Sequence, residues 1–314
     1  MEKRRECWVL TGPTASGKTS LSIRLAKAYG CEIICMDSMQ IYRQMDIGTA
    51  KPTAQEMEGI LHHMLDICDP TDSFSVAQYQ QMAEETADGI FQRGHRVLFV
   101  GGTGLYLRAL RHPMAMGAVC ADETIRAQLQ QEADAPGGKE ALHARLHAVD
   151  AATAERLPIN DVRRVIRALE VYELTGVPFS QQKQVEEEPP FRYRVASLTM
   201  DRAVLYHRIE QRVDQMIKAG LVDEVRTLLA NGVPATAQAM KGLGYKELIP
   251  FLRGECTLET AIDELKKGTR HYAKRQLTWM RREEDVLWVN ALLPEAYEQL
   301  ASWYTQGESN YEEH

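Results

Sequence analysis

The amino-acid sequence predicts an α/β fold, with a parallel sheet core flanked by helices and an inserted all-helical lobe. Short apolar runs typical of strands alternate with segments of helical periodicity near both ends of the chain. A glycine-rich loop joins the first strand to the first helix, and strand-like runs are absent from residues 119–190. We therefore expect a core built from residues 1–118 and 191–314, around a lobe at 119–190.

The composition is that of a folded, reduced protein. With 314 residues, 44% of them hydrophobic, the chain can bury a large core plus a smaller lobe. None of the six cysteines forms a C-x-x-C pair, so we expect free thiols in the cytoplasm. No segment resembles a signal peptide or a membrane span. We also expect a monomer. The net charge of −7 means that any nucleic-acid binding must depend on local basic patches.

Residues 12–19 read GPTASGKT and match the phosphate-loop pattern G-x-x-x-x-G-K-[ST]. An apolar strand at 7–11 precedes the loop and a helix at 21–29 follows it, as the motif requires. Backbone N–H groups and the helix N-terminus would surround phosphate oxygens, and the Thr19 hydroxyl could bind Mg²⁺. We therefore predict a P-loop NTPase-like core. Its phosphate-binding residues would be Gly12, Pro13, Thr14, Ala15, Ser16, Gly17, Lys18 and Thr19.

The second predicted strand, residues 31–35, ends just before Asp37, where the chain turns away from the sheet. Ligand chemistry in open α/β sheets gathers at such carboxyl strand ends. A carboxylate beside a phosphate loop can accept a proton from a nucleophile or hold Mg²⁺. We favour such a role for Asp37 over a simple turn cap.

A helix at 76–93 and a buried strand at 96–100 come next. Ser75 and Gln78 form the capping box that starts the helix. The strand runs into Gly-Gly-Thr-Gly, and a further helix begins near Leu105. The Thr103 hydroxyl in this turn could bind a substrate, but threonine is also an ordinary helix cap, and the pattern alone leaves both readings open.

The predicted lobe places three arginines, Arg163, Arg164 and Arg167, on adjacent turns of one helix. This stripe could clamp phosphates, although a solvated stripe paired with Glu170 is the better interpretation of the residues by themselves. His143 lies four residues before His147 in the lobe, but no glutamate or third ligand accompanies them. We predict no metal site there.

The last part of the chain should return to the sheet through a strand at 193–200, with helices at 202–230 and 257–281 and a final strand at 286–289. Residues 266–282 mix basic side chains with Tyr272 and Trp279, which suits RNA phosphates and unstacked bases. The acidic run at 283–285 could instead neutralise this patch. The loop at 241–246, two lysines around an aromatic residue, is a weaker signal.

In combination, these motifs resemble the tRNA dimethylallyltransferase family. The similarity covers nearly the whole chain and is looser between residues 120 and 158. No Cys/His spacing of the zinc finger found in eukaryotic relatives is present, so the likeness is to the shorter bacterial type. The matching segments, in order, are 12–19, 37–42 (DSMQIY), 45–52 (MDIGTAKP), 100–106 (VGGTGLY), 160–167, 212–220, 241–246 and 274–281.

The resemblance implies that the phosphate loop holds the diphosphate of dimethylallyl diphosphate with Mg²⁺ at Thr19. The acceptor would be the N6 amine of the adenosine directly 3′ of the anticodon in the tRNA anticodon stem-loop. Asp37 would be the general base, and Thr103 would bind near the reacting centre. The residues implied along the tRNA path are Asp37, Ser38, Met39, Gln40, Thr103, Arg126, Arg163, Arg164, Arg167, Lys241, Gly242, Tyr245, Lys246, Lys274, Arg275, Gln276, Trp279 and Arg281.

Three rival functions stay open. Members of the family that prenylate free AMP or ATP generally lack the long lobe and the basic C-terminal run, both of which are present here. In a kinase or ATPase, Asp37 would bind Mg²⁺ or activate a hydroxyl, but the later strand ends in Gly101-Gly102 and not in an aspartate. A non-enzymatic RNA-binding module would leave Asp37 and Thr103 without a role.

Overall fold

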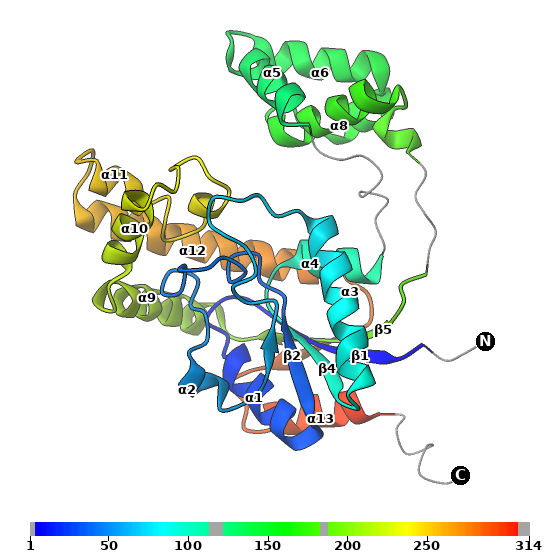
Figure 1. The fold of residues 1–314 in the computed structure, drawn as a ribbon, viewed down its shortest axis with the longest axis vertical. Coiled ribbons are helices and arrows are strands. Elements are labelled where there is room, and N and C mark those ends of the chain that lie inside the picture. The colour runs from blue at the N-terminus through cyan, green and yellow to red at the C-terminus, as the bar shows by residue number, and fades with distance from the viewer. Residues whose placement is uncertain (1–3, 113–121, 183–187, 307–314) are drawn as a thin grey trace. The chain divides into compact units, whose positions relative to one another are not determined.

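The computed structural model of the protein describes residues 4–112, 122–182 and 188–306. Its core is a six-stranded sheet in which all neighbouring strands are parallel, in the order β3-β2-β4-β1-β5-β6 (Figure 1). The predicted α/β core with a parallel sheet is confirmed. The strands are β1 (Glu6–Thr11), β2 (Cys31–Cys35), β3 (His62–His63), β4 (Arg96–Val100), β5 (Arg192–Thr199) and β6 (Val286–Asn290).

Helices accompany this sheet along the whole core. Several begin at the caps that their sequences indicate; α3 starts at the capping box formed by Ser75 and Gln78. The helices of the core are α1 (Lys18–Tyr29), α2 (Ala54–Met57), α3 (Val76–Gln92), α4 (Gly104–Arg111), α9 (Arg202–Lys218), α10 (Leu221–Ala230), α11 (Leu248–Leu252), α12 (Leu258–Met280) and α13 (Ala296–Thr305).

Side-chain alternation along the strands divides the apolar core between the two sheet faces. In β1, Val9 packs into the cluster that α3 and α4 cover, whereas Trp8 packs into the cluster that α1 and α13 cover (Figure 1). Both faces are therefore buried, which explains why the strands read as continuous apolar runs. The carboxyl ends of β1, β2 and β4 meet at one edge of the sheet, because the strands are parallel.

The described part of the lobe is helical and has its own apolar core. It contains α5 (Glu123–Asp134), α6 (Gly138–Val149), α7 (Ala151–Arg156) and α8 (Val162–Thr175). The chain divides into two compact units, residues 1–112 with 189–314 and residues 113–188, a few residues before the boundaries expected at 119 and 190. The buried residues of the lobe include Leu129, Leu142, Leu146, Val165 and Leu169.

Some elements differ from the sequence-based expectations or had none. The helix expected at 202–230 is two helices, because Gly220 adopts a left-handed conformation with φ of 102° between them. His62 and His63 form the short edge strand β3, and the His63 ring contacts the Glu32 carboxylate at 2.6 Å. The terminal helix α13 was not expected. Within the described residues, no helix is long and apolar enough to cross a membrane.

Candidate active site

The phosphate loop connects β1 to α1 at the carboxyl edge of the sheet. Gly12 has φ of 140°, and a Cβ there would lie 2.9 Å from the Leu198 carbonyl oxygen of β5, so only glycine fits. The Ser16 hydroxyl is buried and has no hydrogen-bond partner within the described residues. A buried hydroxyl without a partner is costly, and a phosphate oxygen would satisfy it.

Lys18 is the cation of this loop. Its Nζ donates to the carbonyl oxygens of Gly12 at 2.9 Å and Pro13 at 2.8 Å. Burial, together with the positive charge of Arg212, lowers the pKa of Lys18 to about 8, and the charge of Asp37 opposes this shift. A bound anion would stabilise the charged amine, so the site favours a ligand of high negative charge.

Asp37 follows β2 and lies close enough to Lys18 for their charges to interact. Its Oδ1 accepts from the Met39 backbone N–H at 2.9 Å, which fixes the turn. The Thr103 hydroxyl does not cap α4; it accepts from the Ser38 N–H at 3.0 Å. The structure thus brings Asp37 and Thr103 together, from the ends of two neighbouring strands, and excludes the helix-cap reading of the Thr103 hydroxyl.

The glycine turn after β4 packs against its neighbours at distances that exclude any side chain. A Cβ at Gly101 would lie 2.0 Å from the Met36 carbonyl oxygen, and one at Gly102 would lie 2.0 Å from Gln276 Nε2. Gln276, on α12, accepts from the Thr14 N–H at 2.9 Å and donates to the Gly102 carbonyl at 3.0 Å. Gln276 therefore joins the phosphate loop to the turn that carries Thr103.

Arg212, on α9, is a site residue that the sequence reasoning did not single out. Its charge acts on both Lys18 and Asp37, and burial lowers its pKa. Within the described residues its guanidinium makes no hydrogen bond or ion pair, so it is available to an anion. The family motif at 212–220 contains this arginine. Because it lies on a helix far along the chain from the phosphate loop, no local sequence pattern indicates that the two are neighbours.

The donor set suits a magnesium ion shared with a phosphate ligand. The Thr19 hydroxyl is exposed at the start of α1 and has no hydrogen bond to the described residues. Among those residues, no group of three His, Cys, Asp or Glu side chains could hold a metal alone. Mg²⁺ commonly takes one or two protein oxygens plus phosphate oxygens and water, so Thr19 fits such an ion bound with its substrate.

The basic residues in the first half of the segment 266–282 form ion pairs, whereas the cations in its second half form none with the described residues. Lys266 and Arg270 form ion pairs with Asp214 and Glu210 of α9, both at 2.6 Å. Further along, Glu283 pairs with Arg111 of α4, not with a cation of α12. An open pocket of about 400 Å³ lies in this second half. It is lined by His271, Lys274, Arg275, Thr278, Trp279 and Arg282.

Four exposed cations in this part of the chain make no ion pair with the described residues. This patch has the character expected of an RNA-binding surface, because exposed cations lie beside a partly exposed aromatic ring. Arg275 lies over the Tyr272 ring, 5.8 Å from its centroid. The four cations are Lys274, Arg275, Arg281 and Arg282.

Some residues expected along the tRNA path are buried instead. Tyr245 is fully buried, and its hydroxyl donates to Glu224 at 2.6 Å. Gln276 is 6% exposed and its amide is used inside the protein, as described above. Gly242 is buried against Met39, which leaves the flanking Lys241 and Lys246 as the exposed members of that loop.

The arginines of the lobe also fall into two groups. Glu170 is fully buried and pairs with Arg126 at 2.9 Å and Arg167 at 2.6 Å, so these two residues stabilise the lobe itself. Arg163 and Arg164 are exposed. Arg164 pairs with Asp161 at the start of α8, and Arg163 has no ion pair within the described residues.

Family models and curated relatives match most of this chain. The family model described as IPP transferase matches residues 40–283, and one described as isopentenyl transferase matches residues 5–73. A tRNA dimethylallyltransferase from Desulforudis audaxviator is 51% identical over 283 residues, covering 90% of this chain and 91% of that protein. Its counterpart from Symbiobacterium thermophilum is 50% identical over 289 residues, covering 92% and 90%.

Solved structures are similar over nearly the whole chain. A tRNA isopentenylpyrophosphate transferase from Bacillus halodurans has a TM-score of 0.72 and 42% identity, covering 99% of this chain and 100% of that one. A eukaryotic dimethylallyltransferase acting on tRNA has a TM-score of 0.80 and 28% identity, covering 98% of this chain and 79% of that one. With a family model spanning most of the sequence and relatives of this identity, the chain belongs to the IPP transferase family.

Proposed function

We propose that this protein transfers a dimethylallyl group from dimethylallyl diphosphate to the N6 amine of the adenosine directly 3′ of the anticodon in tRNA, releasing diphosphate. The main structural support is the convergence of Lys18, Asp37 and Arg212, whose charges act on one another at the carboxyl edge of the sheet. The printed activity of relatives that are 51% and 50% identical supports the same reaction.

Asp37 is the general base in this proposal. The N6 amine attacks the allylic carbon, the carbon–oxygen bond to the diphosphate breaks, and the oxygen leaves with the electron pair. Asp37 takes the proton released from N6. Because an exocyclic adenine amine is a weak nucleophile, such proton removal contributes typically about 10²- to 10⁴-fold in rate. Thr103 holds the Ser38 end of the same turn and thereby orients Asp37.

The diphosphate leaving group gains negative charge as the bond breaks. Loop N–H groups, Lys18 and Arg212 lie where they would stabilise that charge, since preorganised donors in a water-poor site act strongly. The unpartnered Ser16 hydroxyl would donate to a phosphate oxygen. Mg²⁺ held with Thr19 would further neutralise the diphosphate.

The tRNA anticodon stem-loop would lie along the unpaired cations and Trp279 of α12, with Lys241 and Lys246 as further contacts. The target adenine must leave its stack before N6 reaches the allylic carbon, and base flipping serves this in other enzymes that modify bases. Arg163 and Arg164 would make the lobe's contribution to RNA binding. We propose a monomer that meets tRNA in the cytoplasm.

The test is transfer of radiolabel from dimethylallyl diphosphate, with Mg²⁺, into unmodified tRNA that carries adenosine at this position. A tRNA with guanosine there is the matched control, and AMP and ATP are parallel acceptors. We expect label only in the adenosine-bearing tRNA. Label in AMP or ATP would make the protein a nucleotide prenyltransferase. Hydrolysis of ATP without any transfer would support a kinase or ATPase and contradict the proposal.

A further inference from the structure

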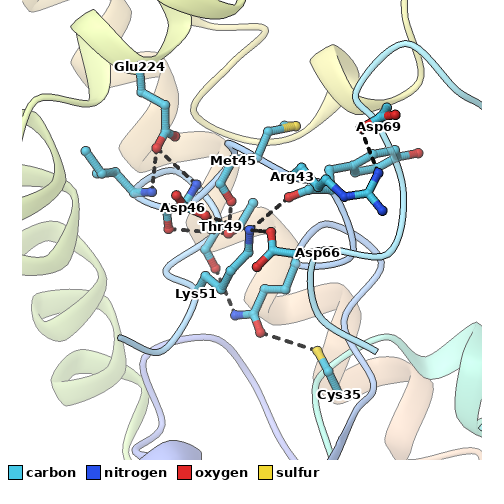
Figure 2. Close-up of polar contacts among 12 residues, drawn as sticks. Cys35, Arg43, Met45, Asp46, Thr49, Lys51, Asp66, Asp69 and Glu224 are labelled. Atoms are coloured by element: carbon cyan, nitrogen blue, oxygen red, sulfur yellow. Dashed lines mark hydrogen bonds and ion pairs between the residues drawn. The ribbon is translucent and has the colours of Figure 1, made fainter. Parts of the chain in front are cut away.

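Residues 45–51, here called loop 45–51, are held by an unusually complete set of hydrogen bonds from Glu224 of α10. Glu224 Oε2 accepts from the backbone N–H groups of Asp46 at 3.0 Å and Ile47 at 2.7 Å. Its Oε1 accepts from the Gly48 N–H at 3.0 Å and from the Tyr245 hydroxyl at 2.6 Å. Figure 2 shows the Glu224 carboxylate directed at the start of the loop. One side chain thus binds four donors, three of them consecutive backbone groups.

The far end of loop 45–51 is fixed by a buried cation. Lys51 is 6% exposed at its side chain, and its Nζ binds the Asp46 carboxylate at 2.6 Å and the Asp66 carboxylate at 2.5 Å (Figure 2). It also donates to the Tyr42 carbonyl oxygen at 2.8 Å. The loop is therefore clamped at both ends and has little freedom to move independently.

Loop 45–51 in turn holds the segment that contains the proposed base. Gln40 Nε2 donates to the carbonyl oxygens of Thr49 and Ala50, both at 3.1 Å. Gln40 Oε1 accepts from Cys35 Sγ at 3.3 Å, so the Gln40 amide spans from the end of β2 to the loop. Asp37 lies between these two anchors, in a turn of only a few residues.

We propose that Glu224 is a positioning residue for the transfer reaction, acting through loop 45–51 and Gln40 to set the place of Asp37. This inference rests on the proposed function. Tyr245 lies between Lys241 and Lys246, whose exposed side chains we assign to RNA binding, so Glu224 joins that segment to the turn of the catalytic carboxylate.

Glu224→Gln tests the inference because it keeps the side-chain size but removes an acceptor. A carboxamide directs its own N–H groups at donors, so at least one backbone N–H of the loop loses its partner. Tyr245→Phe removes one donor and retains the ring that packs against Gly48, where a Cβ would lie 2.6 Å from it. Glu255→Gln, at an exposed glutamate 3.9 Å from Arg253, is the matched control.

The measurement is the single-turnover rate constant of prenyl transfer, with enzyme in excess over tRNA. At saturating enzyme this constant does not depend on the fraction of enzyme that is folded, because tRNA is the limiting reactant, so partial unfolding alone would leave it unchanged. We expect Glu224→Gln to lower it at least tenfold and Tyr245→Phe several-fold, with the KM for dimethylallyl diphosphate within twofold of wild type. The control should react normally.

The outcomes separate the two proposals. If neither wild type nor Glu255→Gln transfers label to tRNA, the proposed function fails. If both react and Glu224→Gln has the wild-type rate constant, the function stands and the positioning role of Glu224 is wrong. If Glu224→Gln instead raised the KM for dimethylallyl diphosphate tenfold and left the rate constant unchanged, the inference would also be contradicted. The effect would then lie at the phosphate loop.

Discussion

At the scale of single residues, the site combines two partly buried cations with one carboxylate. Burial lowers the pKa values of both Lys18 and Arg212, because neither is fully solvated in the absence of an anion. Asp37 offsets part of this cost through its negative charge. An incoming diphosphate would supply charge that a single carboxylate cannot, which is a physical reason for its binding here.

The role of Asp37 can be tested by Asp37→Asn, which keeps an oxygen for the Met39 N–H and removes the base. We expect the single-turnover rate of prenyl transfer to fall by roughly 10²-fold or more, with tRNA affinity near wild type. Asp69→Asn is the control, since Asp69 is exposed and, among the described residues, its carboxylate forms an ion pair with Arg43 alone, at 2.7 Å. Near-normal turnover in Asp37→Asn would remove Asp37 as the base.

At the scale of elements, helix α12 joins the two halves of the site. Its buried side supplies Gln276, which holds the phosphate loop, and Met280, which packs in the core. The exposed side of its last turns supplies unpaired cations beside Trp279. A shift of α12 would therefore move both the side chain that holds the phosphate loop and the cations proposed to bind RNA.

The RNA-binding side of α12 can be tested by neutralising Lys274 and Arg275 together as Lys274→Gln and Arg275→Gln. We expect weaker tRNA binding and a salt dependence that is flatter by up to about one unit of log–log slope per lost phosphate contact. The matched control neutralises Lys267 and Arg253, which are exposed but lie near Glu264 and Glu255. Equal slopes in wild type and the Lys274/Arg275 variant would move the RNA path elsewhere.

At the scale of the whole molecule, the two ends of the described core chain meet on one face of the sheet. Tyr304 of α13 is fully buried and stacks on Trp8 of β1, with ring centroids 4.8 Å apart. Its hydroxyl donates to the Val9 carbonyl oxygen at 2.7 Å. Since Val9 precedes the phosphate loop by three residues, α13 supports the strand on which that loop depends.

The contribution of α13 can be tested by Tyr304→Ala. Removing a buried aromatic side chain leaves a cavity, and we expect the free energy of unfolding of the core to fall by about 3–5 kcal/mol. Urea unfolding followed by tryptophan fluorescence measures this, because all four tryptophans lie outside the lobe. Tyr297→Ala, at a partly exposed residue of the same helix, should cost less. A Tyr304→Ala cost no larger than that of the control would show that α13 is not part of the cooperative core.

Parts of the site could be predicted because their signals are local. The phosphate loop needs glycines, a lysine and a threonine at set spacing between a strand and a helix, and Asp37 follows a recognisable strand. Helix α13 was missed although Ala296, Leu300 and Tyr304 share a face at a spacing of four residues, because the segment is short and adjoins a polar tail.

The amino-acid sequence by itself determined the α/β class, the parallel strands, the phosphate loop and the place of Asp37 at a strand end. Only the tertiary structure decided that Arg212 belongs to the site, that Gln276 is buried and holds the phosphate loop, that Tyr245 is buried on Glu224, and that Arg126 and Arg167 pair with Glu170. Helical periodicity tells which residues share a face, but the surface that this face meets depends on packing between segments far apart in the chain. For Gln276 and Thr14 that separation is 262 residues, beyond the reach of any local pattern.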